Sequence, residues 1–103
     1  MEVVVINTLQ EMRKYYNKES NTYDFEAIEL VVFKFDTIIT QANIQAQNIY
    51  AQNINAKNIN AKYIKAKNIT AIRIECISIN ADKITIKSIN AYNIYADEVN
   101  AQK

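Results

Sequence analysis

The pattern of apolar and polar positions between residues 43 and 102 repeats every five residues. A large apolar residue occupies every fifth position from 44 to 99, and it is Ile eleven times and Val99 once. A small residue occupies every fifth position from 46 to 101, and it is Ala in all units except those of Cys76 and Ile86. A spacing of five fits neither the 3.6-residue period of a helix nor the two-residue period of a simple strand.

Within each five-residue unit, one residue separates the large apolar residue from the small one. Both side chains therefore point to the same side of an extended segment. The two polar residues that follow leave room for a corner before the next unit. The pattern predicts a β-solenoid, in which a coil with flat sides pairs its backbone with the turns above and below it.

The repeat resembles the pentapeptide-repeat family. Asn directly precedes the large residue in six units, as Asn or Asp does in the family: Asn43, Asn48, Asn53, Asn58, Asn68 and Asn93. The family places Ala two residues before the large residue, and only Ala42 does so here. The resemblance implies a mainly β fold, a right-handed four-sided β-helix with one unit per side and about three coils.

Four units per turn would stack residues that are twenty positions apart. This geometry predicts a column of Asn60, Asn80 and Asn100, whose amides can hydrogen-bond along the rod. It also predicts that Lys67 stacks on Lys87 and that Tyr92 stacks on Ile72.

Residues 1–40 lack the repeat and are predicted to form an N-terminal cap, with the β-helix over residues 41–103. The segment from Glu2 to Ile6 has the pattern of a strand. Thr8 and Glu11 have the spacing of a capping box for a short helix that ends near Tyr16. Residues 23–40 are interpreted as an irregular first coil. The alternative is that residues 1–40 are themselves the functional head.

The sequence has little that supports catalysis or metal binding. It has no His and no Gly, and its carboxylates are scattered. We therefore expect a protein that is not an enzyme and that binds no metal or cofactor. Cys76 occupies a small-residue position and is expected to be buried. No secretory signal or segment of transmembrane length is recognised, which predicts a soluble cytoplasmic protein without a membrane interaction.

Two sets of outward side chains are candidates for partner binding. The net charge is +1, but residues 41–103 carry eight basic and four acidic side chains. Five lysines are expected near one corner, where they would meet phosphates or an acidic protein face, or would form a solvated surface: Lys62, Lys65, Lys67, Lys83 and Lys87. The second set is apolar and consists of Ile72, Ile77 and Tyr92, covered either by the N-terminal helix or by a partner.

The last coil is expected to expose an unpaired strand edge, which favours pairing with a second copy. Tyr92, Tyr95 and Val99 are the candidate contacts of a homodimer. The alternative is a monomer whose open end is covered by the two tyrosines.

The size and the family resemblance favour a protein-binding scaffold. Its expected function is to inhibit a nucleic-acid-acting enzyme or a defence nuclease, as small phage or mobile-element inhibitors do, whether anti-CRISPR-like or gyrase-inhibitor-like. One alternative is an assembly module that dimerises or polymerises through its C-terminal coil. Another is direct nucleic-acid binding through the lysines.

Overall fold

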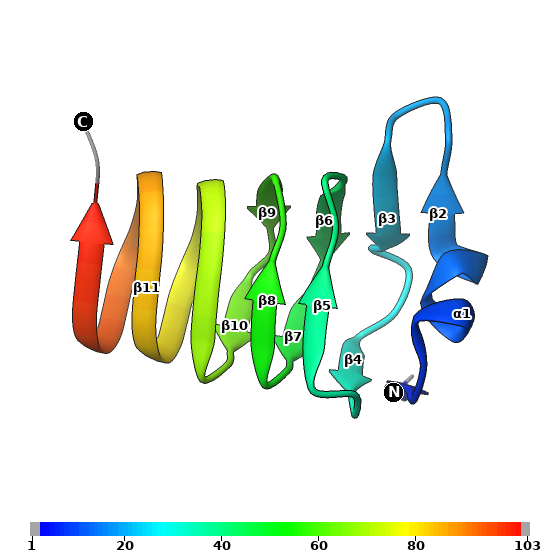
Figure 1. Ribbon diagram of the computed structural model, residues 1–103, viewed down its shortest axis with the longest axis horizontal. Coiled ribbons are helices and arrows are strands. Elements are labelled where there is room, and N and C mark those ends of the chain that lie inside the picture. The colour runs from blue at the N-terminus through cyan, green and yellow to red at the C-terminus, as the bar shows by residue number, and fades with distance from the viewer. Residues whose placement is uncertain (1–2, 102–103) are drawn as a thin grey trace.

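The computed structural model describes residues 3–101, so the predicted strand start at Glu2 and the last two residues of the predicted β-helix, Gln102 and Lys103, lie outside it. The chain is mainly β, with 68% strand and 7% helix, and it forms a β-solenoid with one short helix near its N-terminus. Figure 1 shows the strands rising on the near side and descending behind as the chain advances, which makes the coil right-handed. The predicted mainly β solenoid is confirmed.

The elements follow one another around the solenoid axis (Figure 1). The first part of the chain contains β1 (Val3–Ile6), α1 (Leu9–Met12), a 3-10 turn (Arg13–Tyr15), β2 (Tyr16–Asn17), β3 (Thr22–Phe25), β4 (Leu30–Phe33) and β5 (Thr37–Ile39). The repeat contains β6 (Asn43–Ala46), β7 (Asn48–Tyr50), β8 (Asn53–Asn55), β9 (Asn58–Asn60), β10 (Tyr63–Lys65) and β11 (Asn68–Ala101). The last of these is one continuous extended segment that bends around every corner.

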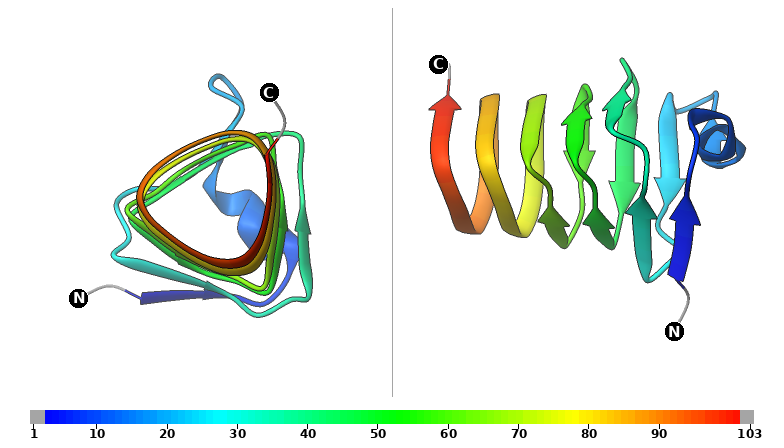
Figure 2. Two further views of the ribbon diagram at one scale, coloured as in Figure 1. Left: turned by 90° about the vertical axis from the view of Figure 1, so that its left-hand side faces the viewer. Right: turned by 60° about the horizontal axis from the view of Figure 1, so that its bottom comes forward.

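The strands form three flat sides, and each turn of the repeat takes fifteen residues. Ile64 lies between Ile49 and Ile79 in the parallel register, fifteen positions from each. Side A contains β1, β4, β7, β10 and residues 78–80 of β11. Side B contains β5, β8 and residues 68–70. Side C contains β2, β3, β6, β9 and residues 73–75. Figure 2 shows the triangular outline along the axis.

The expected four-sided cross-section with twenty residues per turn was therefore wrong. Each turn of the repeat points only three large side chains inward, one from the middle of each side, and these are almost all Ile. Three Ile side chains fill a narrow triangular interior, whereas a four-sided coil would leave space at its centre that branched, short side chains do not reach. Ala at the corners allows the sides to meet closely.

The core is a continuous stack of these inward side chains. The twelve largest fully buried side chains are all apolar and belong to β1, α1 and the solenoid strands. One of them, Ile86, lies at a corner that Ala occupies in most other units. No polar or charged side chain is buried in the part of the chain that the structure describes. Each buried Ile contributes about 1.5–3 kcal/mol, so this column is the main source of stability.

Asn side chains form ladders on the outside, but not between the residues that the twenty-residue spacing predicted. The Nδ2 of Asn58 donates to the Oδ1 of Asn43 at 2.8 Å, and the Nδ2 of Asn68 donates to the Oδ1 of Asn53 at 2.7 Å. Asn60 instead lies beside Gln45 and Glu75. The predicted hydrogen bonding between amides along the rod is confirmed, but it joins residues fifteen positions apart and not twenty.

The first turn is wider than the repeat and narrows corner by corner. The central inward residues Tyr23, Val31, Ile38 and Ile44 are eight, seven and six positions apart, and the spacing is five from Ile44 onward. The wider interior is filled by aromatic rings, with Phe25 and Phe33 in an edge-on contact at 5.5 Å between ring centroids. This is the irregular first coil that the sequence predicted for residues 23–40.

The N-terminal helix lies across the wide end of the coil, and β1 adds a strand to side A beside β4 (Figure 2). The Oγ1 of Thr8 accepts from the backbone N–H of Glu11 at 3.2 Å, and the Oε2 of Glu11 accepts from the backbone N–H of Asn7 at 2.8 Å. Met12 at the end of α1 is fully buried against the core. Within residues 3–101, no helix has the length and hydropathy needed to cross a membrane.

Candidate functional site: an apolar side of the solenoid

Side A carries apolar and aromatic side chains on its outer surface over four adjacent strands. The parallel register places Val3 beside Leu30 and Val5 beside Val32, and Val32 in turn lies beside Tyr50. Tyr63 follows on β10, beside Asn48 of β7. We call this surface the apolar patch, and its members are Val3, Val5, Leu30, Val32, Tyr50 and Tyr63, all exposed or half-buried.

The apolar patch ends at a cation. Lys65 follows Tyr50 in the register of β7 and β10, and its Nζ lies 5.4 Å from the centroid of the Tyr50 ring. This cation–π contact restrains the Tyr50 ring, which is still 44% exposed. Lys65 is the only charged side chain on the described outward positions of β1, β4, β7 and β10.

Side C is polar at the equivalent positions of β3, β6 and β9, and side B is polar there except at Ile39 of β5, which is 69% exposed. Side B presents Asn53 and Asn68 in one column, with Asn55 and Thr70 beside them. Side C presents Asn43, Asn58 and Arg73 in one column. Scattered exposed hydrophobic residues are common on protein surfaces, but six on one flat side of a small solenoid, interrupted only by Asn48 between Leu30 and Tyr63, form a surface of the kind that partners cover.

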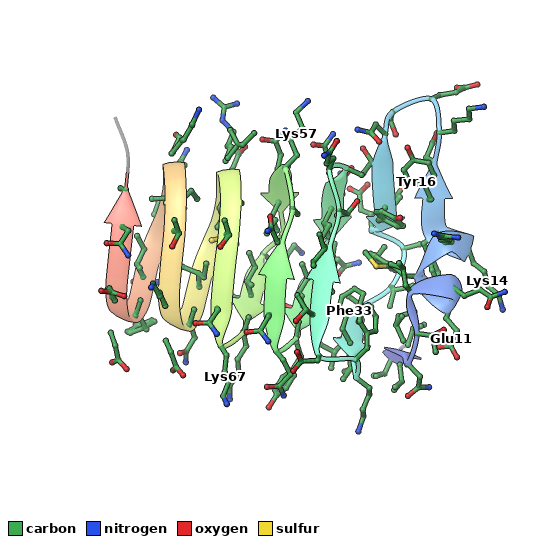
Figure 3. The ribbon with its side chains drawn as sticks, in the orientation of Figure 1. Glu11, Lys14, Tyr16, Phe33, Lys57 and Lys67 are labelled. Atoms are coloured by element: carbon green, nitrogen blue, oxygen red, sulfur yellow. The ribbon has the colours of Figure 1, made fainter. Side chains whose placement is uncertain are left out.

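The structure does not bring the five candidate lysines together. Asp82 donates its backbone N–H to the carbonyl of Lys67, so Asp82 and not Lys87 stacks on Lys67. Lys87 lies at another corner, in the groove that also contains Lys57. Figure 3 shows Lys57 and Lys67 on opposite edges of the solenoid.

Of the remaining lysines, Lys62 lies apart from the others and Lys83 lies near Lys67. Lys62 lies at the corner between sides C and A, where it accepts from Ile77 through its backbone carbonyl. Lys83 lies near Lys67 but forms an ion pair with Glu98 at 3.5 Å. The expected lysine corner was wrong because it depended on a spacing of twenty residues.

The outward residues Ile72, Ile77 and Tyr92 lie at two different corners. Ile77 and Tyr92 line the same shallow groove beside Lys62. Ile72 lies at the corner of Lys57, whose carbonyl accepts the backbone N–H of Ile72 at 2.8 Å. Tyr92 therefore does not stack on Ile72, and α1 does not cover this set, because it lies at the other end of the solenoid (Figure 1).

The last described turn exposes part of its inward layer. Ile94 and Val99 are 42% and 43% exposed, and the outward rings of Tyr92 and Tyr95 are 88% and 60% exposed. Ile84 lies one fifteen-residue turn before Val99 and is fully buried. The two tyrosines do not cover the open end.

The described residues offer few side chains for a nucleophile or a metal site. Burial raises the pKa of the Cys76 thiol to about 11, so the thiol stays neutral and unreactive at physiological pH. Among residues 3–101, no three His, Cys, Asp or Glu side chains are grouped as a metal site would need.

The sequence contains the residues of the apolar patch, but its local pattern predicts only the separate strands. The Val3–Ile6 run predicted a strand, and residues 30–32 predicted part of the first coil. Tyr50 and Tyr63 became neighbours of these residues only once the register was known. No protein-family model, curated protein or solved structure matches this chain.

Proposed function

We propose that this protein is a non-enzymatic, protein-binding scaffold whose binding surface is the apolar patch on side A. The observation that carries the proposal is the outward placement of six apolar or aromatic side chains on the adjacent strands β1, β4, β7 and β10. Removing such a patch from water is worth about 25 cal/mol per Å² of apolar surface buried.

The backbone beneath the patch favours this use. The four strands are hydrogen-bonded neighbours in a parallel ladder, and their inward side chains Val31, Ile49 and Ile64 are buried. A partner would therefore meet a surface already held in one conformation, and little ordering entropy would oppose binding. Tyr50 and Tyr63 have the rigid, amphipathic rings that are enriched in binding hot spots.

The resemblance of the repeat to pentapeptide-repeat proteins supports a finer proposal for the partner. On that analogy, the scaffold inhibits a nucleic-acid-acting enzyme or a defence nuclease by occupying a surface of that enzyme. The net charge is +1 and none of the three sides over residues 3–101 is mainly acidic, so an apolar contact, and not an imitation of DNA, is the mode of binding that these residues support.

Site-specific photo-crosslinking tests the proposal. A photo-reactive phenylalanine analogue is placed at Tyr63, and in a control protein at Glu75 on side C, in cells that produce the protein. We expect one partner protein to be captured from Tyr63 and not from Glu75. Calorimetry with the purified partner should then show a negative heat-capacity change, and the double variant Val32→Ser/Tyr50→Ser should bind at least tenfold more weakly.

Two results would reject this assignment. One is equal capture from Tyr63 and Glu75. The other is a captured partner that the double variant binds with unchanged affinity. If the partner acts on nucleic acid and is inhibited by the protein, the finer proposal is supported. A partner without such activity would reject the inhibitor proposal and support only the protein-binding scaffold.

A second candidate function is assembly through the last described turn. Its support is the exposure of Ile94 and Val99, which belong to the inward layer, beside the exposed rings of Tyr92 and Tyr95. Two such turns facing each other would cover both apolar layers with two-fold symmetry. Light scattering at high micromolar concentration should show a homodimer that Tyr95→Lys weakens, whereas a monomeric parent protein would exclude assembly.

A further inference from the structure

A groove follows the corner between sides B and C, on a different part of the molecule from the apolar patch. Its volume is about 860 Å³. The corner residues Lys57, Ile72 and Lys87 lie along it, one from each of three successive turns. The groove therefore runs parallel to the solenoid axis and crosses several strand layers.

The wide first turn and the hairpin of β2 and β3 form one end of this groove. Tyr16 and Asn21 of the hairpin line it, and the phenolic O–H of Tyr16 donates to the Oδ1 of Asn21 at 2.6 Å. Figure 1 shows the hairpin rising above the edge of the following turns. The step from the wide first turn to the narrow repeat thus creates a ledge, and the groove begins beneath it.

The charges in the groove have one sign. Its described lining residues include two lysines and no carboxylate. Lys57 and Lys87 are thirty positions apart, which is two turns, so they are separated by about 9.6 Å along the axis at ~4.8 Å per strand layer. Ile72, 47% exposed, lies between them. A ligand that fits would carry a negative charge at every second strand layer.

The other lining groups are hydroxyls and amides. Threonines contribute from three layers and amides from two, and the half-exposed Tyr16 ring packs against Tyr23 with ring centroids 5.0 Å apart. This set is Thr40, Thr70, Thr85, Gln41 and Asn55. Such groups bind a ligand that is rich in hydroxyls, and a tyrosine ring beside them packs against the apolar face of a sugar.

We propose that this groove binds a linear acidic polysaccharide, with the polymer lying along the solenoid axis. One sugar ring spans about the length of one strand layer, so a polymer with a carboxylate on every second sugar would match the spacing of Lys57 and Lys87. Tyr16 and Ile72 would contact the rings, and the threonines would bond the hydroxyls. A nucleic acid fits less well, because phosphate binding requires more cations and base stacking requires more exposed aromatic rings than this groove provides.

Titration with defined oligosaccharides tests the proposal. Hyaluronate decasaccharide carries a carboxylate on every second sugar and is the probe; a neutral dextran of similar length and a twelve-nucleotide oligothymidylate are the comparison ligands. We expect saturable binding of the decasaccharide at low salt. The double variant Lys57→Ala/Lys87→Ala should weaken this binding at least tenfold, whereas Lys67→Ala, at the opposite edge, should leave it unchanged.

Thermal unfolding of each variant distinguishes a lost contact from a lost fold, since both groove lysines are exposed. The proposal would be overturned if the decasaccharide showed no saturable binding, or if the folded double variant bound it as tightly as the parent protein. It would also be overturned if dextran bound equally well or if oligothymidylate bound more tightly than the decasaccharide. Because the groove and the apolar patch share no residues, failure here leaves the proposed protein-binding function untouched.

Discussion

Replacing Ile69 by Ala measures how much one inward side chain contributes to the fold. Ile69 lies in the middle of side B, in register with Ile54, and is only 1% exposed. The change removes three carbon groups worth ~0.8 kcal/mol each, or about 2.4 kcal/mol of transfer free energy. The cavity left between rigid strand layers adds to this loss, so we expect a total of about 3–4 kcal/mol within the usual 2–5 kcal/mol range.

Ile72→Ala is the matched control, since it makes the same chemical change three positions away. Ile72 is 47% exposed at a corner, so its replacement should cost less than about 1 kcal/mol, mostly through the lower strand preference of Ala. Urea unfolding followed by circular dichroism gives both free energies, provided that the slope with urea is unchanged. Equal losses at the two positions would refute the inward assignment of the repeat isoleucines.

Two further predictions concern the ladder and the buried thiol. Asn53→Ala and Asn68→Ala, measured singly and together by urea unfolding, should show a coupling of about 0.5–1.5 kcal/mol because their amides share a 2.7 Å hydrogen bond; strict additivity would contradict the ladder. Cys76 ionises near pH 9.0 when unfolded and near pH 11 when buried, so stability present below pH 9 should be lost as the pH rises from 9 to 11. Cys76→Ala should therefore lose less stability between pH 8 and pH 11 than the parent protein, and identical pH profiles would show that the thiol is not buried.

The five-residue pattern was sufficient to predict a solenoid and its inward residues. The spacing of Ile and Ala within each unit determines which side chains face the core, and this holds for three sides as well as for four. Ile54 and Ile69 are buried in either geometry. The same is true of Cys76, whose small side chain fits the corner.

The number of sides could not be predicted from the same pattern, because every side contains five residues in both geometries. The angle of each corner depends on how well three or four large side chains fill the interior, which is a property of the packed turn and not of one unit. Every prediction that used stacked neighbours depended on this number. Lys67 and Lys87 lie at different corners for this reason, although a spacing of twenty would have stacked them.

The apolar patch was missed for a related reason. Its residues are far apart in the sequence, from Val3 to Tyr63, and they come together only through the register of β1, β4, β7 and β10. The shifted spacing of the first turn, eight, seven and six residues between central positions, also hides the alignment of Val32 with Tyr50. Local pattern predicts each strand here, but not the surface that the strands form together.

The fifteen-residue register is the central claim, because it gives each turn of the repeat three sides and aligns the corner residues of the groove. Disulfide formation between paired cysteines on a Cys76→Ala background tests it directly. Tyr63 and Ser78 are register partners on side A, about 4.8 Å apart in Cα position, which suits a disulfide. The account predicts rapid oxidation of Tyr63→Cys/Ser78→Cys and none of Asn58→Cys/Ser78→Cys, whose positions are twenty apart and lie on different sides. Crosslinking of the second pair and not of the first would contradict it.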